Sequence, residues 1–84
     1  MSVYDPLRDY LQQCNLQNLR MSFAEIEDLL GRPLPPSARR RAEWWANEDP
    51  DITAHVQCRA WQSAGYAAEV NLTGKAVTFR RNPN

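Results

Sequence analysis

The sequence predicts one α+β domain with four short helices followed by a C-terminal β-hairpin. Apolar residues recur at helical spacing in four segments between residues 5 and 64, with capping or breaking residues between them. After Gly65 the spacing changes to strict alternation, which is typical of a hairpin with one apolar face. A chain of 84 residues has the length of one domain, so residues 1–84 are expected to form a single unit.

The first helix is expected over residues 5–14. Asp5 and Pro6 are typical of a helix start, with Asp5 as the capping acceptor and Pro6 at the first helical position. Four residues at helical spacing form its expected apolar face: Leu7, Tyr10, Leu11 and Cys14. A short strand is expected next, at residues 19–21.

The second helix has the clearest boundaries. Ser22 and Glu25 form a capping-box pattern, in which each side chain satisfies the other residue's main-chain N–H. Gly31 is a typical residue just beyond a helix end. The expected buried stripe of this helix is Phe23, Ile26, Leu29 and Leu30.

A proline-rich connector, residues 32–36, separates this helix from a third one expected over residues 37–46. Its apolar face is expected to contain Ala38, Ala42 and Trp45. A fourth helix is expected to begin at a cap formed by Asp51 or Thr53 and to end at Ala64. Its expected buried stripe is Ile52, Val56, Ala60 and Ala64, with Trp61 alongside.

The hairpin is expected to consist of an alternating strand from Tyr66 to Leu72, a turn at residues 73–75 and a second strand containing Val77 and Phe79. The whole order of elements is then close to that of a winged helix-turn-helix. Two features depart from that pattern: the proline-rich connector is long, and the fourth helix separates the third helix from the hairpin.

This order leads to a first functional hypothesis, a small regulatory DNA-binding domain that binds double-stranded DNA and could act as a homodimer. The third helix would be the reading helix, because the N-terminal part of such a helix enters the major groove. Its arginines suit phosphate and guanine contacts, and the hairpin would supply flanking cations. The predicted nucleic-acid-binding residues are Arg39, Arg40, Arg41, Trp44, Lys75, Arg80 and Arg81.

The arginine run and Trp44 also have ordinary structural interpretations. Arg39 or Arg40 could pair with Glu43 on a solvated helix face. Trp44 could stack on a base, or it could pack within the domain, which is the more common fate of a tryptophan.

The second hypothesis is a protein-interaction module that regulates or inhibits a larger protein. The chain has ten basic and ten acidic side chains and therefore no net charge. Residues 1–31 have two basic and five acidic side chains, and residues 32–84 have eight basic and five acidic ones. Such polarity suits contact with an oppositely charged partner surface. The second helix, with Glu25, Glu27 and Asp28, would then be the contact surface.

Catalysis, metal binding and cofactor binding are not expected. His55 is the only histidine, and with Cys58 it forms one weak pair rather than a ligand set or a protected nucleophile. No glycine-rich phosphate loop occurs. Cys14 and Cys58 are expected to be thiols. No apolar run is long enough to span a membrane, and a cytoplasmic location is expected.

The chain also resembles a family of short prokaryotic domains of unknown function. Seven segments support the resemblance, which extends from Tyr4 to Arg81: residues 4–7, 22–27, 30–35, 37–38, 44–47, 60–65 and 77–80. The unusual ones are Trp44-Trp45-Ala46-Asn47 and the Trp-x-x-Ala-Gly pattern from Trp61 to Gly65. The resemblance implies one compact domain and no particular activity or cofactor.

Overall fold

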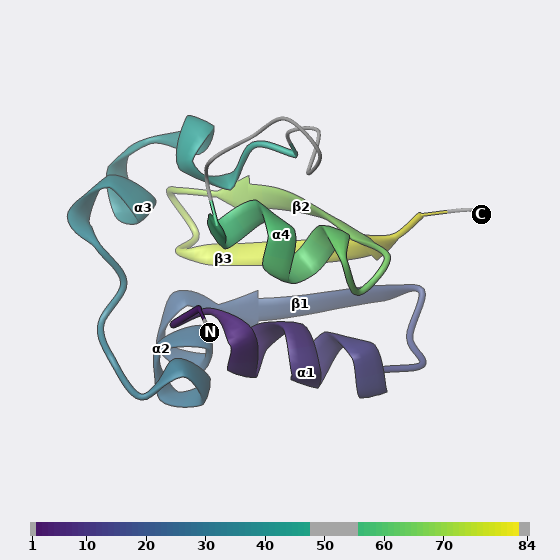
Figure 1. Cartoon of the computed structure of the whole chain (residues 1–84). Coiled ribbons are helices and arrows are strands. Elements are labelled where there is room, and N and C mark those ends of the chain that lie inside the picture. The colour runs from purple at the N-terminus through teal and green to yellow at the C-terminus, as the bar shows by residue number, and fades with distance from the viewer. Residues whose placement is uncertain (1, 48–55, 83–84) are drawn as a thin grey trace.

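A computed structural model describes residues 2–47 and 56–82 of the chain. It confirms the α+β class (Figure 1). The elements in chain order are α1 (Asp5–Gln13), β1 (Asn18–Ser22), α2 (Phe23–Leu30), α3 (Pro36–Arg40), the 3-10 helix η1 (Ala42–Trp45), α4 (Val56–Gln62), β2 (Tyr66–Asn71) and β3 (Ala76–Arg81).

The predicted hairpin is part of a larger sheet. β1 joins it, giving an antiparallel three-stranded sheet in the order β1-β3-β2. β3 is therefore the central strand. Leu19 of β1 lies opposite Phe79, and Met21 lies opposite Val77. These cross-strand apolar pairs explain why the short strand predicted at residues 19–21 pairs with the hairpin.

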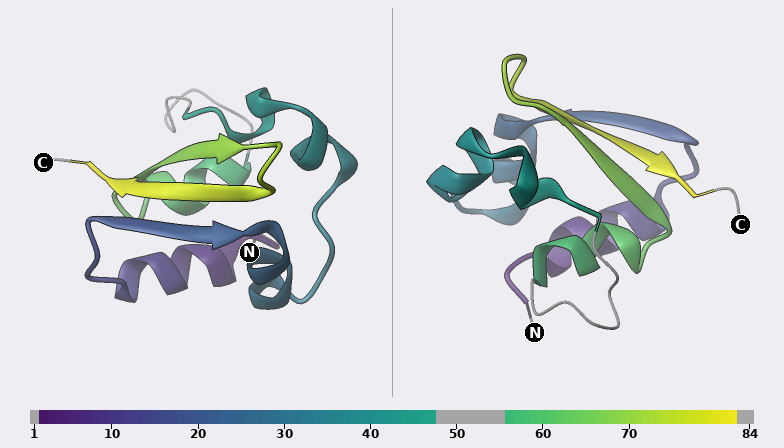
Figure 2. Two further views of the ribbon diagram at one scale, coloured as in Figure 1. Left: turned by 180° about the vertical axis from the view of Figure 1, so that it is seen from behind. Right: turned by 90° about the horizontal axis from the view of Figure 1, so that it is seen from above.

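The sheet has one covered face and one open face. Figure 2 shows α1 and α4 packed on the same side of the sheet, with no helix over the opposite side. Phe79 and Tyr66, which face the helices, are fully buried. By alternation, the open face contains Asn18, Arg20, Ala67, Glu69, Thr78 and Arg80.

The predicted boundaries of α2 are confirmed. The Ser22 hydroxyl accepts the N–H of Glu25 at 3.0 Å, and the Glu25 carboxylate accepts the N–H of Ser22 at 2.9 Å. These hydrogen bonds hold the pKa of Glu25 below its usual value. Gly31 ends the helix with φ +74°, a left-handed conformation that glycine adopts without steric cost.

The start of α1 differs from the prediction. Tyr4 is the cap residue, and Asp5 lies inside the helix. The Asp5 carboxylate instead accepts the N–H of Ser2 at 3.1 Å. Leu7 and Leu11 are fully buried, as expected, but Tyr10 is 45 % exposed. Tyr10 lies about 60° from Leu7 around the helix axis, so it stands at the margin of the buried stripe rather than within it.

The third helix is broken, which corrects the prediction of one helix over residues 37–46. α3 ends at Arg40, Arg41 is extended with φ −127° and ψ 122°, and η1 follows. In a continuous helix Ala38 and Trp45 would be about 10 Å apart along the axis. The break lets the buried Trp45 indole fold back and donate a hydrogen bond of 2.8 Å to the Ala38 carbonyl.

The winged arrangement is not confirmed, and the expected reading helix, α3, has only five residues. The predicted start of the fourth helix, with Asp51, Ile52 and Thr53, lies outside the described residues. Within α4, Ala60 and Trp61 are buried as expected.

Candidate interaction surfaces

Arg39 fastens α3 to α2. Its Nη2 atom lies 2.6 Å from Oε2 of Glu27, and its guanidinium lies 5.7 Å from the centre of the Phe23 ring. The same carboxylate oxygen accepts the N–H of Leu34 at 2.7 Å. The Leu34 hydrogen bond, and then the Arg39 contact, hold the pKa of Glu27 below its usual value. Arg39 is therefore occupied within the domain, by Glu27 rather than by Glu43.

Arg80 and Arg81 of β3 also make internal contacts. Arg80 pairs with Glu69 on the open face of the sheet and lies 3.4 Å from the amide oxygen of Asn18. Arg81 donates hydrogen bonds to the Cys14 carbonyl and, at 3.0 Å, to the Tyr66 hydroxyl. The Arg81 guanidinium also lies over the Tyr66 ring, 5.1 Å from its centre. Arg81 thus fastens the end of α1 to the sheet.

Trp44 belongs to an aromatic array that crosses the core. Its ring centre lies 5.7 Å from that of Tyr4 and 4.6 Å from that of Trp45, both in edge-on geometry. The array continues from Trp45 to Phe23 and Trp61, and from Trp61 to Phe79. Trp44 is half-buried in this array, which supports the packing interpretation of the residue.

Three predicted cations remain on the surface. Arg40, Arg41 and Lys75 are exposed, and within residues 2–47 and 56–82 no ion pair or side-chain hydrogen bond engages them. α3 and the turn between β2 and β3, which contains Lys75, lie at the same end of the molecule (Figures 1 and 2). Of the seven predicted nucleic-acid-binding residues, these three are the ones that stay available.

The acidic surface expected on α2 is largely used inside the domain. Glu25 completes the capping box and Glu27 holds Arg39 and Leu34. Asp28 is the exposed acid left on this helix without a hydrogen bond from a described residue. The helix therefore offers less charge to a partner than its sequence indicates.

Asn47 closes the outer edge of β2, a role that the sequence analysis missed. Its amide group accepts the N–H of Ala68 at 2.7 Å and donates to the carbonyl of Ala68 at 2.9 Å. It also accepts the indole N–H of Trp61 at 2.9 Å. One side chain thus pairs with the strand as a neighbouring strand would. The Trp44-Trp45-Ala46-Asn47 segment is therefore explained by packing and edge pairing.

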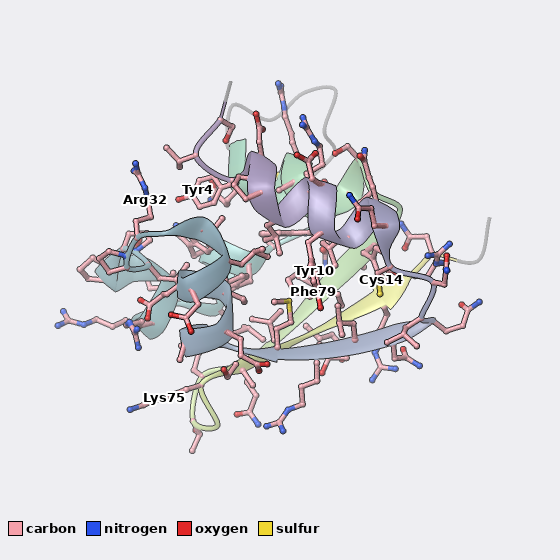
Figure 3. All side chains as sticks on the ribbon, turned by 90° about the horizontal axis from the view of Figure 1, so that it is seen from below. Tyr4, Tyr10, Cys14, Arg32, Lys75 and Phe79 are labelled. Carbon is pink, nitrogen blue, oxygen red and sulfur yellow. The ribbon has the colours of Figure 1, made fainter. Side chains whose placement is uncertain are left out.

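A shallow apolar groove lies between α1 and β1. Its volume is about 280 Å³, and it is lined by Tyr10, Gln13, Cys14, Leu16 and Leu19. Tyr10 is 45 % exposed and Leu16 is 55 % exposed. Figure 3 shows Tyr10 and Cys14 in the space between α1 and β1. The sequence signal that could have indicated this groove is Leu16, an apolar residue between the polar Asn15 and Gln17.

No group of three or more His, Cys, Asp or Glu side chains that could hold a metal ion occurs among the described residues. His55 lies outside this part of the chain, and Cys58 is buried. None of the helices in the described ranges is both long enough and apolar enough to cross a membrane.

Comparison with known proteins identifies one family. The family model described as "Domain of unknown function (DUF7662)" matches residues 4–83. No curated protein matches, and no solved structure matches. Because the family model covers nearly the whole chain, the protein belongs to the DUF7662 family of domains of unknown function.

Proposed function

We propose that the protein is a small, non-enzymatic protein-interaction module that binds a larger partner through the groove between α1 and β1. The single observation behind this proposal is the exposure of Tyr10 and Leu16, both of which line that groove. Large apolar side chains that share one exposed surface depression are typical of protein contact sites. The shallow shape of the groove suits a polypeptide better than an enclosed small molecule.

The internal contacts of the arginines favour this function over DNA binding. Arg39, Arg80 and Arg81 each serve to join elements of the domain, and Trp44 packs in the aromatic array. Moving Arg39 or Arg81 to DNA would break contacts that join α3 to α2 or the end of α1 to the sheet, whereas the Arg80–Glu69 pair is exposed. α3 is also only five residues long, about 7 Å, which is short for a helix that reads bases along a groove.

Site-specific crosslinking can test the interaction surface. A photoreactive amino acid at Gln13, which lines the groove, is expected to give a discrete adduct with one protein, identified by mass spectrometry. A photoreactive residue at Arg40 is the matched control and is expected not to trap that protein. The purified partner should then bind the wild type in calorimetry and bind the Tyr10→Ser/Leu16→Ser variant at least about tenfold more weakly. Equal binding by both proteins would contradict the proposal.

DNA binding is the second candidate, favoured by the exposed Arg40, Arg41 and Lys75 at one end of the molecule. Titration of a labelled random duplex at about 50 mM and about 200 mM salt tests it. Binding that weakens steeply with salt and is lost in the Arg40→Ala/Arg41→Ala/Lys75→Ala variant would support this function. The absence of binding at the lower salt concentration would exclude these cations as a DNA-contacting set.

A further inference from the structure

The outer edge of β1 carries main-chain groups that face away from the sheet. The N–H of Arg81 donates to the carbonyl of Gln17 at 2.7 Å, which fixes the pairing between β1 and β3. In this register, odd-numbered residues of β1 direct their main-chain groups toward β3, and Asn18 and Arg20 direct theirs outward. In the part of the chain that the structure describes, nothing hydrogen-bonds to the outward groups of Asn18 and Arg20.

Some of the other outward groups of the sheet are covered by side chains. The outward N–H of Ser22 is taken by the Glu25 carboxylate at 2.9 Å. At the opposite edge, Asn47 takes both main-chain groups of Ala68 in the middle of β2. Natural sheets protect their edges in such ways, because unpaired edges attract other strands. The outward groups of Tyr66 and Val70, on either side of Ala68, have no hydrogen-bond partner among the described residues. Because Asn47 occupies the middle of the β2 edge, the continuous stretch from Asn18 to Arg20 is the better place for another strand to pair.

The two sides of this stretch differ in chemistry. On the helix-covered side, the apolar groove with Tyr10, Leu16 and Leu19 runs beside β1. In Figure 3, which views the molecule from below, Tyr10 and Cys14 lie between the ribbons of α1 and β1. On the open face, Arg20 projects with an exposed side chain and makes no ion pair within 4 Å with a described residue, although its charge contributes to the lowered pKa of Glu25. A strand that pairs here would have alternate side chains in an apolar and in a cationic environment.

We propose that β1 binds an extended segment of a partner protein as a fourth strand of the sheet. Alternate apolar side chains of the segment occupy the α1–β1 groove, and an acidic side chain lies beside Arg20. The main-chain groups of Asn18 and Arg20 supply affinity, and the groove and Arg20 supply sequence preference. This inference rests on the proposed protein-interaction function and names the form and chemistry of the partner.

A second copy of the chain is a poorer occupant than an acidic segment. Two β1 strands paired antiparallel through these groups would place both Arg20 side chains on the same face of the joined sheet, opposite or diagonal to each other. Like charges in such positions destabilise strand pairing, whereas opposite charges stabilise it. The charge of Arg20 thus favours a partner strand with an acidic residue at this position.

Selection from a phage-displayed library of random dodecapeptides tests the inference with the purified full chain. Selected peptides are expected to share an alternating pattern of apolar residues with at least one acidic residue between them. In amide-resolved NMR titrations, the largest shifts should fall in β1 and the groove side of α1. N-methylation of a synthetic peptide should weaken binding about tenfold at every second residue and leave the intervening positions unaffected. This periodic pattern reports main-chain pairing without altering the protein.

Substitutions of Arg20 separate the main-chain contribution from the charge. Because its N–H points away from β3, Arg20→Pro removes an outward donor without removing a bond of the sheet. Arg20→Pro should weaken peptide binding about tenfold, and Arg20→Ala, which keeps the N–H, about two- to fivefold. Arg20→Glu should shift the selected peptides from acidic to basic at the facing position. A far-UV circular dichroism spectrum identical to that of the wild type is the control for folding.

Four results would overturn the inference. They are recovery of no peptide, binding of peptides as helices, shifts confined to other surfaces, and a dimer abolished by Arg20→Pro. If crosslinking at Gln13 still traps a partner that Tyr10→Ser/Leu16→Ser weakens, the interaction function stands and strand addition alone fails. If neither experiment identifies a partner, both proposals fail.

Discussion

The indole N–H of Trp61 in α4 donates a 2.9 Å hydrogen bond to the side-chain oxygen of Asn47, beyond the end of η1. Trp61 is fully buried, so this bond satisfies a polar group that has no access to water. The same oxygen accepts the N–H of Ala68 in β2. Asn47 therefore joins the segment after η1 to α4 and to β2.

Replacement of Asn47 should destabilise the domain more than the replacement of an ordinary surface residue does. Asn47→Ala leaves the Trp61 N–H without a partner, and we expect it to lower the free energy of unfolding by about 1–3 kcal/mol. Urea denaturation monitored by tryptophan fluorescence measures this change. Asn15→Ala, at an exposed loop position, is the control and should change stability by less than about 0.5 kcal/mol. Equal stability of the two variants would contradict the role given to Asn47.

The free energy of unfolding should depend on pH through the ionisation of Glu27. Its folded-state pKa lies below the ordinary value of 4.5, because the Leu34 N–H and Arg39 favour the charged form. A lowered pKa stabilises the folded state above pH 4.5, and this contribution is lost as the pH falls through the folded-state pKa. The difference in unfolding free energy between the wild type and Glu27→Gln should therefore be largest near neutral pH and shrink in acid.

Urea titrations at several pH values between about 3 and 7 measure that difference. Asp28→Asn, on the same helix, is the matched control because no hydrogen bond or ion pair from a described residue engages the Asp28 carboxylate. A constant difference between wild type and Glu27→Gln across this range would sink the prediction. Glu25, whose pKa is also lowered, should leave some acid dependence in Glu27→Gln.

Substitution of Gly31 isolates the cost of a backbone conformation. A Cβ atom added at Gly31 would meet no atom within 4 Å, so steric crowding does not contribute. With φ +74°, Gly31→Ala should lower the free energy of unfolding by about 1–2 kcal/mol. Gly31→Asn should cost less, because asparagine tolerates the left-handed region better. Thermal unfolding of the wild type and the two variants gives the order of their stabilities. If Gly31→Ala is as stable as the wild type, the end of α2 adjusts without strain and the prediction is wrong.

Substitutions of Leu11, in α1, and of Leu16, in the loop that follows α1, should distinguish a residue that supports the fold from one that is available for binding. Leu11 is fully buried, and Leu11→Ala is expected to lower the unfolding free energy by about 2–5 kcal/mol. Leu16 is 55 % exposed, and Leu16→Ser should change it by less than about 0.5 kcal/mol. Chemical denaturation measures both. A large loss of stability in Leu16→Ser would mean that Leu16 supports the fold and would remove it from the proposed contact surface.

Local signals predicted local structure well. The capping box of Ser22 and Glu25 and the terminal Gly31 depend only on residues within one helix, so the sequence was sufficient for α2. The alternation from Tyr66 onward likewise predicted the β2–β3 hairpin. The α+β class followed from these periodicities.

Long-range contacts explain what the sequence pattern missed. The break at Arg41 accompanies a hydrogen bond from the Trp45 indole to the Ala38 carbonyl, seven residues earlier, which helical periodicity does not report. The pairing of β1 with β3 joins residues about sixty positions apart. Arg39 was expected to pair, if at all, with the nearby Glu43, but folding brings it to Glu27. The candidate groove was missed for the same reason, since Tyr10 and Leu19 meet only after α1 packs beside the sheet.

The different treatment of the two sheet edges limits how copies of this domain can assemble. Growth of a fibre by successive strand addition requires two open edges on each molecule. One edge pairs with the preceding molecule and the other pairs with the next. Here Asn47 occupies the centre of the β2 edge, and Asn18 and Arg20 leave β1 open. Asn47 therefore hinders strand addition at the centre of the β2 edge, so that association through β1 is less readily continued from β2 into an open-ended fibre.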